Sequence, residues 1–203
     1  MTINTNDMLN SILESISRID YIHPEDIPNI DLYMDQVTTF MDAQLASTKR
    51  YHEDKILTKT MINNYAKNNL LPPPVKKKYT KEHVLVLIFI YYFKNILSIK
   101  DIETLLKPIT DKAFSDGETL DMTELYEAIC AMEKAQINPL QEEIRAAYEK
   151  AEESFSDAAE DDRSYLHLFS FICSLSFDVY VKKLLIEKII DELPRSEGKQ
   201  PKK

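Results

Sequence analysis

Lys76, Lys77 and Lys78 follow directly after three prolines, residues 72–74, in a chain whose formal net charge is −9. Proline fixes its own φ and disfavours the helical conformation in the residue before it, so this segment is expected to be stiff and extended. Three neighbouring ammonium groups give a density of positive charge that suits phosphate groups, which require no base-specific geometry. The segment therefore indicates polyanion binding. A solvated lysine loop that only keeps the protein soluble is the alternative.

A polar helix face is expected just before the prolines. Thr58 is a good N-cap, and Met61, Ile62 and Tyr65 have the spacing of a buried helix face within residues 58–69. The opposite face carries lysine and asparagine side chains, namely Lys59, Asn63, Asn64, Lys67 and Asn68. Asparagine can form two hydrogen bonds with adenine in the major groove of DNA. This face is a candidate reader of bases, with an ordinary solvated helix face as the alternative.

Positive charge is concentrated in one part of the chain. Residues 49–107 contain twelve Lys and Arg against five Asp and Glu, a net charge of +7, whereas the remainder has a net charge of −16. A loop expected over residues 46–57 adds Arg50 to the candidate phosphate contacts, with Lys49 and Lys55 beside it. Such polarisation favours a nucleic-acid partner over an even surface charge.

Enzymatic and metal chemistry finds little support in the sequence. The two glycines, Gly117 and Gly198, are too few for a Walker loop, a dinucleotide fingerprint or a nucleophile elbow. The four histidines are scattered, and the acidic pairs of residues 142–162 are adjacent rather than four apart, so neither a metal site nor paired acid–base catalysis is expected. We expect no catalytic residues and no cofactor. Cys130 and Cys173 lie in apolar helical patterns and are predicted to be reduced core residues.

The scarcity of glycine and the apolar spacing predict an all-α fold. In the first half, helices are expected within residues 1–20, from Asp31 to Leu45, over 58–69, from an N-cap at Thr80 through residue 93, and from an N-cap at Ser98 to residue 106. In the second half they are expected over 122–136, from Pro139 to 155, and over 164–193. Apolar residues surround most of this last helix, so its own domain or another subunit must cover it.

Read together, residues 58–106 resemble the winged-helix core of MerR-type transcription regulators. The match comprises Thr58, Ile62, Tyr65, Leu70, Leu71 and Pro72, then Lys77, Tyr79 and Thr80, and finally Ser98, Ile99, Asp101, Ile102 and Leu106. With residues 27–45 included, the chain is similar to a group of uncharacterised bacterial proteins, mostly from Firmicutes, that are known only as a domain of unknown function with a MerR-like segment.

The resemblance implies a MerR-like winged helix-turn-helix module followed by a helical C-terminal region. Its domains would be an N-terminal helix and linker (1–26), a DNA-binding module (27–108), a helical dimerisation or effector region (109–193) and a disordered tail (194–203). The recognition helix would be 58–69 and the lysine-rich wing 74–79. Tyr79 would anchor the wing against the core, or its hydroxyl would reach a phosphate.

The function expected from this resemblance is a non-enzymatic transcriptional regulator that binds double-stranded DNA as a homodimer, because one small reading head contacts few bases. A small-molecule or protein effector remains an open option. The rival hypothesis is a protein-interaction adaptor that keeps the scaffold without binding DNA. It is favoured by Asn63, which stands where MerR-type proteins usually carry an arginine. The N-terminus lacks a basic region before an apolar run, and residues 164–177 are too short for a membrane span, so a cytoplasmic location is expected.

Overall fold

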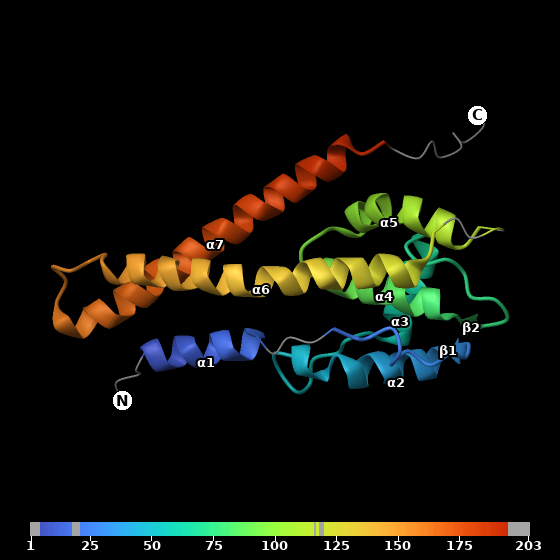
Figure 1. Cartoon of the computed structure of the whole chain (residues 1–203), viewed down its shortest axis with the longest axis horizontal. Helices are drawn as coiled ribbons and strands as arrows, with labels where there is room; N and C mark the ends of the chain where they lie inside the picture. Colours follow the sequence, from blue (N-terminus) through green and yellow to red (C-terminus); the bar gives the residue numbers. More distant parts are fainter. Residues whose placement is uncertain (1–4, 18–20, 116, 118–119, 195–203) are drawn as a thin grey trace. The chain divides into compact units, whose positions relative to one another are not determined.

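The computed structural model describes residues 5–17, 21–115, 117 and 120–194. Within these ranges the chain is all-α apart from a sheet of two short strands, which agrees with the predicted fold class (Figure 1). The chain divides into two compact units, the first made of residues 1–21 and 129–185 and the second of residues 22–128 and 186–203. Most of the predicted tail lies outside the described residues, as do residues 1–4 and 18–20 of the segment in which the N-terminal helix was expected.

The second unit is built around helix α4, Lys81–Phe93. Its residues 83–91 are all buried, as expected for a helix that is apolar on every side. The elements around it are α2 (Met34–Gln44), the 3-10 turn η1 (Ala46–Thr48), α3 (Lys59–Lys67), α5 (Ile99–Ala113) and the strands β1 (Leu32–Tyr33) and β2 (Lys78–Tyr79). The buried helix therefore provides a fixed base for the elements around it.

The predicted N-caps at Thr58, Thr80 and Ser98 are confirmed. The backbone N–H of Met61 donates to Oγ1 of Thr58 over 3.2 Å. At Ser98 the cap is reciprocal, since the N–H of Asp101 donates to Oγ of Ser98 and that hydroxyl lies 2.6 Å from Oδ2 of Asp101. The caps at Thr58 and Ser98 each satisfy an N–H group that the helix leaves without an internal partner, and so fix where these helices begin.

Several predicted boundaries were wrong. Leu32 and Tyr33 were expected in the first turn of a helix capped by Asp31, but they form β1, and α2 begins at Met34. Helix α5 continues through Pro108 to Ala113 instead of ending at residue 106. Pro139 does not start a helix, because α6 runs without interruption from Met122 to Glu152. A proline inside a helix removes one backbone hydrogen bond, and a long helix with other contacts can tolerate that loss.

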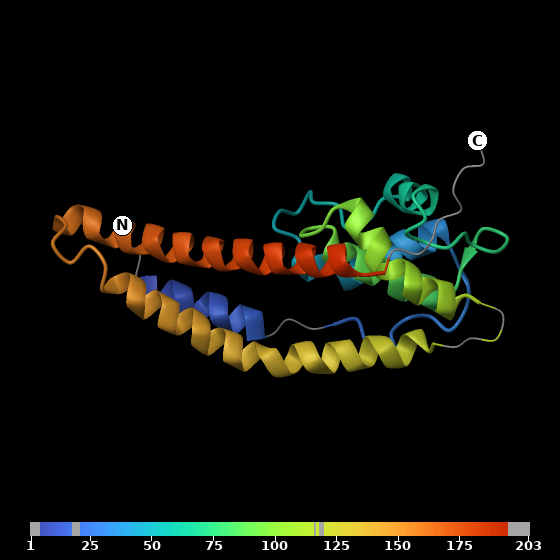
Figure 2. The same ribbon diagram turned by 90° about the horizontal axis from the view of Figure 1, so that it is seen from above.

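The first unit contains α1 (Thr5–Ser17) and parts of α6 and α7 (Glu160–Glu192), which are joined by the turn at residues 153–159 (Figure 2). Helix α1 lies beside α6, where three hydrogen bonds join the two. Nε2 of Gln141 donates to the carbonyl of Leu13 over 2.7 Å, Nη1 of Arg145 donates to Oδ1 of Asn10, and the Tyr148 hydroxyl donates to Oγ1 of Thr5. The N-terminal helix therefore belongs structurally with residues 129–185.

The buried core of this unit is small. It consists of Leu9, Leu13, Tyr148, Ala151 and Phe171, with Ile16, Ile144, Ala147, Leu168 and Leu175 partly buried around it. Cys173 was predicted to be a core residue but is exposed on α7, and Cys130 is half-buried; neither forms a disulfide bond. Hydropathy alone placed Cys173 inside, whereas the side of α7 on which it lies has no covering element in the described structure.

Within the described residues, no helix has both the length and the apolar character needed to cross a bilayer. In the same part of the chain, no group of three or more His, Cys, Asp or Glu side chains is placed to hold a metal ion.

Candidate nucleic-acid interface

Helix α3 presents the predicted polar face to solvent. Ile62 and Tyr65 are buried against the unit, as their spacing predicted. The five predicted contacts on this helix and its C-cap, Lys59, Asn63, Asn64, Lys67 and Asn68, are all exposed. Because residues four apart lie on one face of a helix, Lys59, Asn63 and Lys67 form one row and Asn64 and Asn68 form the next. The arrangement offers amide groups for base edges and ammonium groups for phosphates on one surface.

The C-terminal end of α3 is closed by a defined hydrogen-bonded motif. Asn69 has a φ of 56°, in the left-handed region that asparagine tolerates better than most residues. The N–H of Leu70 donates to the carbonyl of Tyr65 over 2.9 Å, and the N–H of Asn69 donates to the carbonyl of Ala66, which is the Schellman pattern. In addition, Nδ2 of Asn68 donates to the carbonyl of Asn64 over 2.8 Å. One amide of the polar face is therefore already used to hold the helix end.

The three lysines lie in a tight turn, residues 75–78, which we call the lysine turn. The N–H of Lys78 donates to the carbonyl of Val75 over 2.9 Å, and the two central residues, Lys76 and Lys77, have φ values of 51° and 64°. Positive φ at both central positions defines a type I′ turn, which usually contains Asn and Gly. An L-residue with a side chain in this conformation costs about 1 kcal/mol or more. The lysines therefore occupy these positions despite a conformational penalty.

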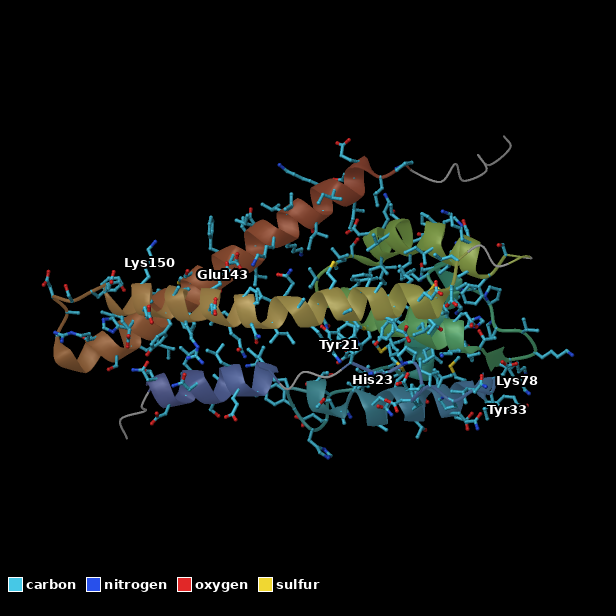
Figure 3. The ribbon with its side chains drawn as sticks, viewed as in Figure 1. Tyr21, His23, Tyr33, Lys78, Glu143 and Lys150 are labelled. Atoms are coloured by element: carbon cyan, nitrogen blue, oxygen red, sulfur yellow. The ribbon has the colours of Figure 1, made fainter. Side chains whose placement is uncertain are left out.

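A short sheet holds the lysine turn at its C-terminal side. Strand β2 pairs antiparallel with β1, with Leu32 opposite Tyr79 and Tyr33 opposite Lys78. Nζ of Lys78 lies 5.6 Å from the centroid of the Tyr33 ring, and the two side chains lie together at one end of the unit (Figure 3). Such a cation–π contact orients the ammonium group without neutralising its charge. Lys78 is half-buried, while Lys76 and Lys77 are exposed.

Tyr79 lies in the core, with 3% of its surface exposed. Burial raises the pKa of its hydroxyl, and its ring makes an edge contact with His83 at a centroid distance of 5.6 Å. Of the two roles expected for this tyrosine, the geometry matches the anchor. We therefore leave its side chain out of the candidate contact surface.

His83 connects the two ends of the segment that contains the lysine turn. The N–H of Thr80 donates to Nδ1 of His83 over 3.1 Å, and the ring packs edge-on against Phe114. The imidazole is 2% exposed, and this burial lowers its pKa. Glu82, the backbone carbonyls of Pro73 and Pro72, and Asp31 act in the opposite direction and raise it, but burial outweighs them. The ring therefore favours its neutral form, with the proline backbone on one side and the end of β2 on the other.

The loop before α3 is also attached to the core helix. Nζ of Lys94 donates to the carbonyl of Ile56 over 2.8 Å and lies 4.6 Å from the centroid of the Tyr91 ring. Burial lowers the pKa of Lys94. Arg50, a predicted contact in this loop, is exposed and lies 5.2 Å from the ring centroid of its neighbour Tyr51. Arg50 is thus exposed to solvent. It lies in the loop before α3, whereas the contacts of His83 are with Thr80 and Phe114, so they do not link Arg50 to the lysine turn.

The candidate surface comprises the exposed residues and the half-buried Lys78, namely Arg50, Lys59, Asn63, Asn64, Lys67, Asn68, Lys76, Lys77 and Lys78. Sequence reasoning identified these residues but missed the contribution of Tyr33 and the central position of His83. Tyr33 carries no local signal, because its partner Lys78 is 45 positions away in the chain. His83 stands three residues after Thr80, a spacing typical of capping, and that signal was available although its contact with Phe114 was not.

Comparison with known proteins gives one match. No curated protein and no solved structure matches the chain. A family model described as a domain of unknown function, DUF1836, matches residues 22–129, more than half of the chain. The matched region contains every residue of the candidate surface. The chain therefore belongs to the DUF1836 family.

Proposed function

We propose that this protein is a transcriptional regulator that binds double-stranded DNA through the candidate surface. The observation that supports this most directly is the lysine turn, where Lys76 and Lys77 are exposed and have positive φ. Asparagine and glycine would form the same turn with less strain, so the presence of two lysines at these positions points to a role for their charge. Phosphate is the partner that such a cluster suits best.

In this proposal α3 is the recognition helix and the segment 74–79 is the wing of a MerR-like module. The lysines fix the position of the protein on the phosphate backbone, while Asn63 and Asn64 contact base edges in the major groove. The net charge of +7 over residues 49–107 supports this division of roles, since the rest of the chain repels DNA. The protein works as a homodimer, which doubles these contacts and reads a two-fold symmetric site.

The test is binding of the purified protein to fragments of its own genome at two salt concentrations, followed by sequencing of the retained DNA. We expect enrichment of a shared palindromic site whose affinity falls as salt rises. Replacing Lys76, Lys77 and Lys78 by glutamine should weaken binding to all DNA by about 100-fold near 0.1 M salt and reduce the salt slope by about 1 per lost phosphate contact.

A matched control removes the same charge elsewhere. Lys112, Lys134 and Lys150 are exposed outside residues 49–107, and their triple replacement by glutamine should leave DNA affinity within about threefold, since long-range effects are screened. Equal losses of DNA affinity in both triple variants would show that only the net charge of the protein matters. The lysine turn would then have no special role in DNA binding. Absence of salt-sensitive retention by the native protein would overturn DNA binding altogether.

One observation favours a second candidate, a protein-interaction adaptor. The acidic part of the chain has a net charge of −16, and α7 exposes several large apolar side chains. Exposed apolar surface of this kind is typical of protein interfaces. The two candidates differ in the genomic binding test, because an adaptor would retain no DNA.

A further inference from the structure

In the first unit, several large apolar side chains of α6 and α7 are exposed. Its core ends at Tyr148 and Phe171, close to the turn that joins α6 to α7. Farther from this turn, α6 and α7 border an open groove of about 520 Å³, whose apolar lining includes Leu140, Ile144, Ala147, Leu175, Phe177 and Val181. Ile144, Ala147 and Leu175 are partly covered because they pack against the core, whereas Leu140, Phe177 and Val181 are exposed.

Helix α7 also carries an exposed apolar stripe, which we define as Tyr165, Phe169, Ile172, Phe177 and Tyr180. Their exposed fractions lie between 51% and 68%. At helical spacing these residues fall within roughly 140° of the helix circumference. They lie away from Leu168, Phe171 and Leu175, which pack toward the core of the unit. Large aromatic side chains on an uncovered helix face are unusual in a monomer.

The exposed area is sufficient for a stable interface. From their exposed fractions, the five residues of the stripe offer roughly 700 Å², close to the 800 Å² or so that each partner contributes to a typical specific complex. The groove does not extend this face, because it is lined by Leu175, from which the stripe points away, and only Phe177 belongs to both sets. The stripe by itself therefore offers enough apolar area for a two-fold interface.

Charge favours a second copy of the same chain as the partner. Residues 164–177 contain no Asp, Glu, Lys or Arg, so two copies can meet there across a two-fold axis without like-charge repulsion. The first two of the charges that follow on α7 are paired with each other, apart from any partner, since Nζ of Lys182 lies 2.8 Å from Oδ2 of Asp178. The hydrogen bond from Lys182 to Asp178 raises the pKa of this lysine, and the charge of Glu143 adds to that effect.

We infer that a second copy of the chain docks on the stripe of α7, and that the two copies exchange aromatic side chains across a two-fold axis. The inference deepens the proposed function, which needs two reading heads, although the surface on which it rests is separate from the candidate surface for DNA. The midpoint of the stripe lies near residue 172. Parallel pairing, or antiparallel pairing that overlaps the whole stripe, therefore brings the two copies of Cys173 close together.

The experiment is sedimentation of the full chain without DNA over a wide range of protein concentrations. We expect a dimer that dissociates on dilution. The double variant Phe177→Glu/Tyr180→Glu should raise the dimer dissociation constant by about 100-fold, since buried aromatic side chains dominate interface energies and a carboxylate there would have no partner. Ile30→Glu is the control, because Ile30 has the same 68% exposure as Phe177 and lies in the second unit.

A cross-linking measurement on protein that keeps all five stripe residues tests the interface even if the Glu variant misfolds. A short bis-maleimide should link Cys130→Ser protein into dimers through Cys173, and Cys173→Ser protein should not be linked. A monomer at every concentration, or a dimer unaffected by the Glu variant and not linked through Cys173, would overturn the inference. These outcomes are independent of DNA binding, because a dimer that retains no DNA would refute only the proposed function, and a monomer that binds DNA would refute only the interface.

Discussion

The backbone N–H of Thr80 donates a hydrogen bond to Nδ1 of the buried His83 imidazole over 3.1 Å. Oγ1 of Thr80 lies 2.9 Å from the same nitrogen. The nitrogen can accept these bonds only while it is unprotonated, so the capping of α4 and the end of β2 depend on the neutral ring. One imidazole thus links the N-terminus of the central helix to the segment that carries the lysine turn.

This geometry predicts that folding stability falls in mild acid. Burial lowers the pKa of His83 below its ordinary value of 6.5, so the unfolded chain takes up a proton before the folded protein does. Stability should therefore be complete above about pH 6.5 and should fall as the pH drops toward the lowered pKa of the folded state. Urea unfolding between about pH 8 and pH 5 measures this effect.

The control for the acid effect is His83→Asn, which keeps an acceptor near the position of Nδ1 but does not titrate. Its stability should change less with pH than that of the native protein over the same range. His52 is exposed, and His52→Ala should retain the native pH dependence. A native slope that survives in His83→Asn protein would assign the effect to other groups.

A variant of the lysine turn can separate the effect of its charge on DNA binding from the effect of its conformation on folding stability. The double variant Lys76→Asn/Lys77→Gly puts the preferred type I′ residues at positions with φ values of 51° and 64°. It should leave stability unchanged or raise it by about 1 kcal/mol, since the relief of strain exceeds the added flexibility of glycine in the unfolded chain. DNA affinity should nevertheless fall at least about tenfold at low salt. Thermal unfolding and a salt titration of binding measure the two effects, and lower stability would contradict the assigned turn type.

Asn63 and Asn68 should give opposite results although both belong to the candidate surface. Asn63→Ala should leave thermal stability nearly unchanged and reduce discrimination at one base position by about 1–3 kcal/mol. Asn68→Ala removes the amide that donates to the carbonyl of Asn64, so it should lower stability by about 1 kcal/mol. Differential scanning calorimetry and selection from a randomised DNA pool distinguish the two. Unaltered base preference in Asn63→Ala protein would remove this residue from base recognition.

The small core of the first unit makes Leu13 a sensitive position. Its side chain is 1% exposed, and Leu13→Ala should cost about 2–5 kcal/mol through lost burial and the cavity left behind. Hydrogen exchange should accelerate in residues 5–17 and 144–175, which contribute to this core. Ile12 is 47% exposed on the same helix, and Ile12→Ala should change exchange little. Similar exchange in the two variants would show that this core contributes little stability.

Local signals predicted the parts of the fold whose partners lie close in sequence. The caps at Thr58, Thr80 and Ser98 each use a partner three residues away, so composition and spacing were sufficient. The exposed face of α3 followed from helical periodicity for the same reason. These features depend on one turn of helix and need no knowledge of the tertiary structure.

Features that depend on distant residues were not predictable from local patterns. Residues 32 and 33 became a strand because they pair with residues 78 and 79, and this pairing encloses the turn in which Lys76 and Lys77 take positive φ. Pro139 has the preferences of a helix start, but contacts along the 31 residues of α6 outweigh the roughly 3 kcal/mol that an internal proline costs. The exposure of Cys173 depends on which elements cover α7, and hydropathy does not reveal this.

Helix α3 has nine residues, too few to be stable in isolation, yet both of its ends are fixed, by Thr58 at the start and by Asn69 at the finish. In the proposed complex the helix would therefore meet DNA already ordered, with little conformational entropy left to lose. Calorimetry of binding would show a heat-capacity change that matches the surface buried at the interface alone, without the larger change that accompanies folding on contact. A wrong base would then meet a helix that cannot adjust to it, and discrimination would come from rigidity as much as from hydrogen bonds.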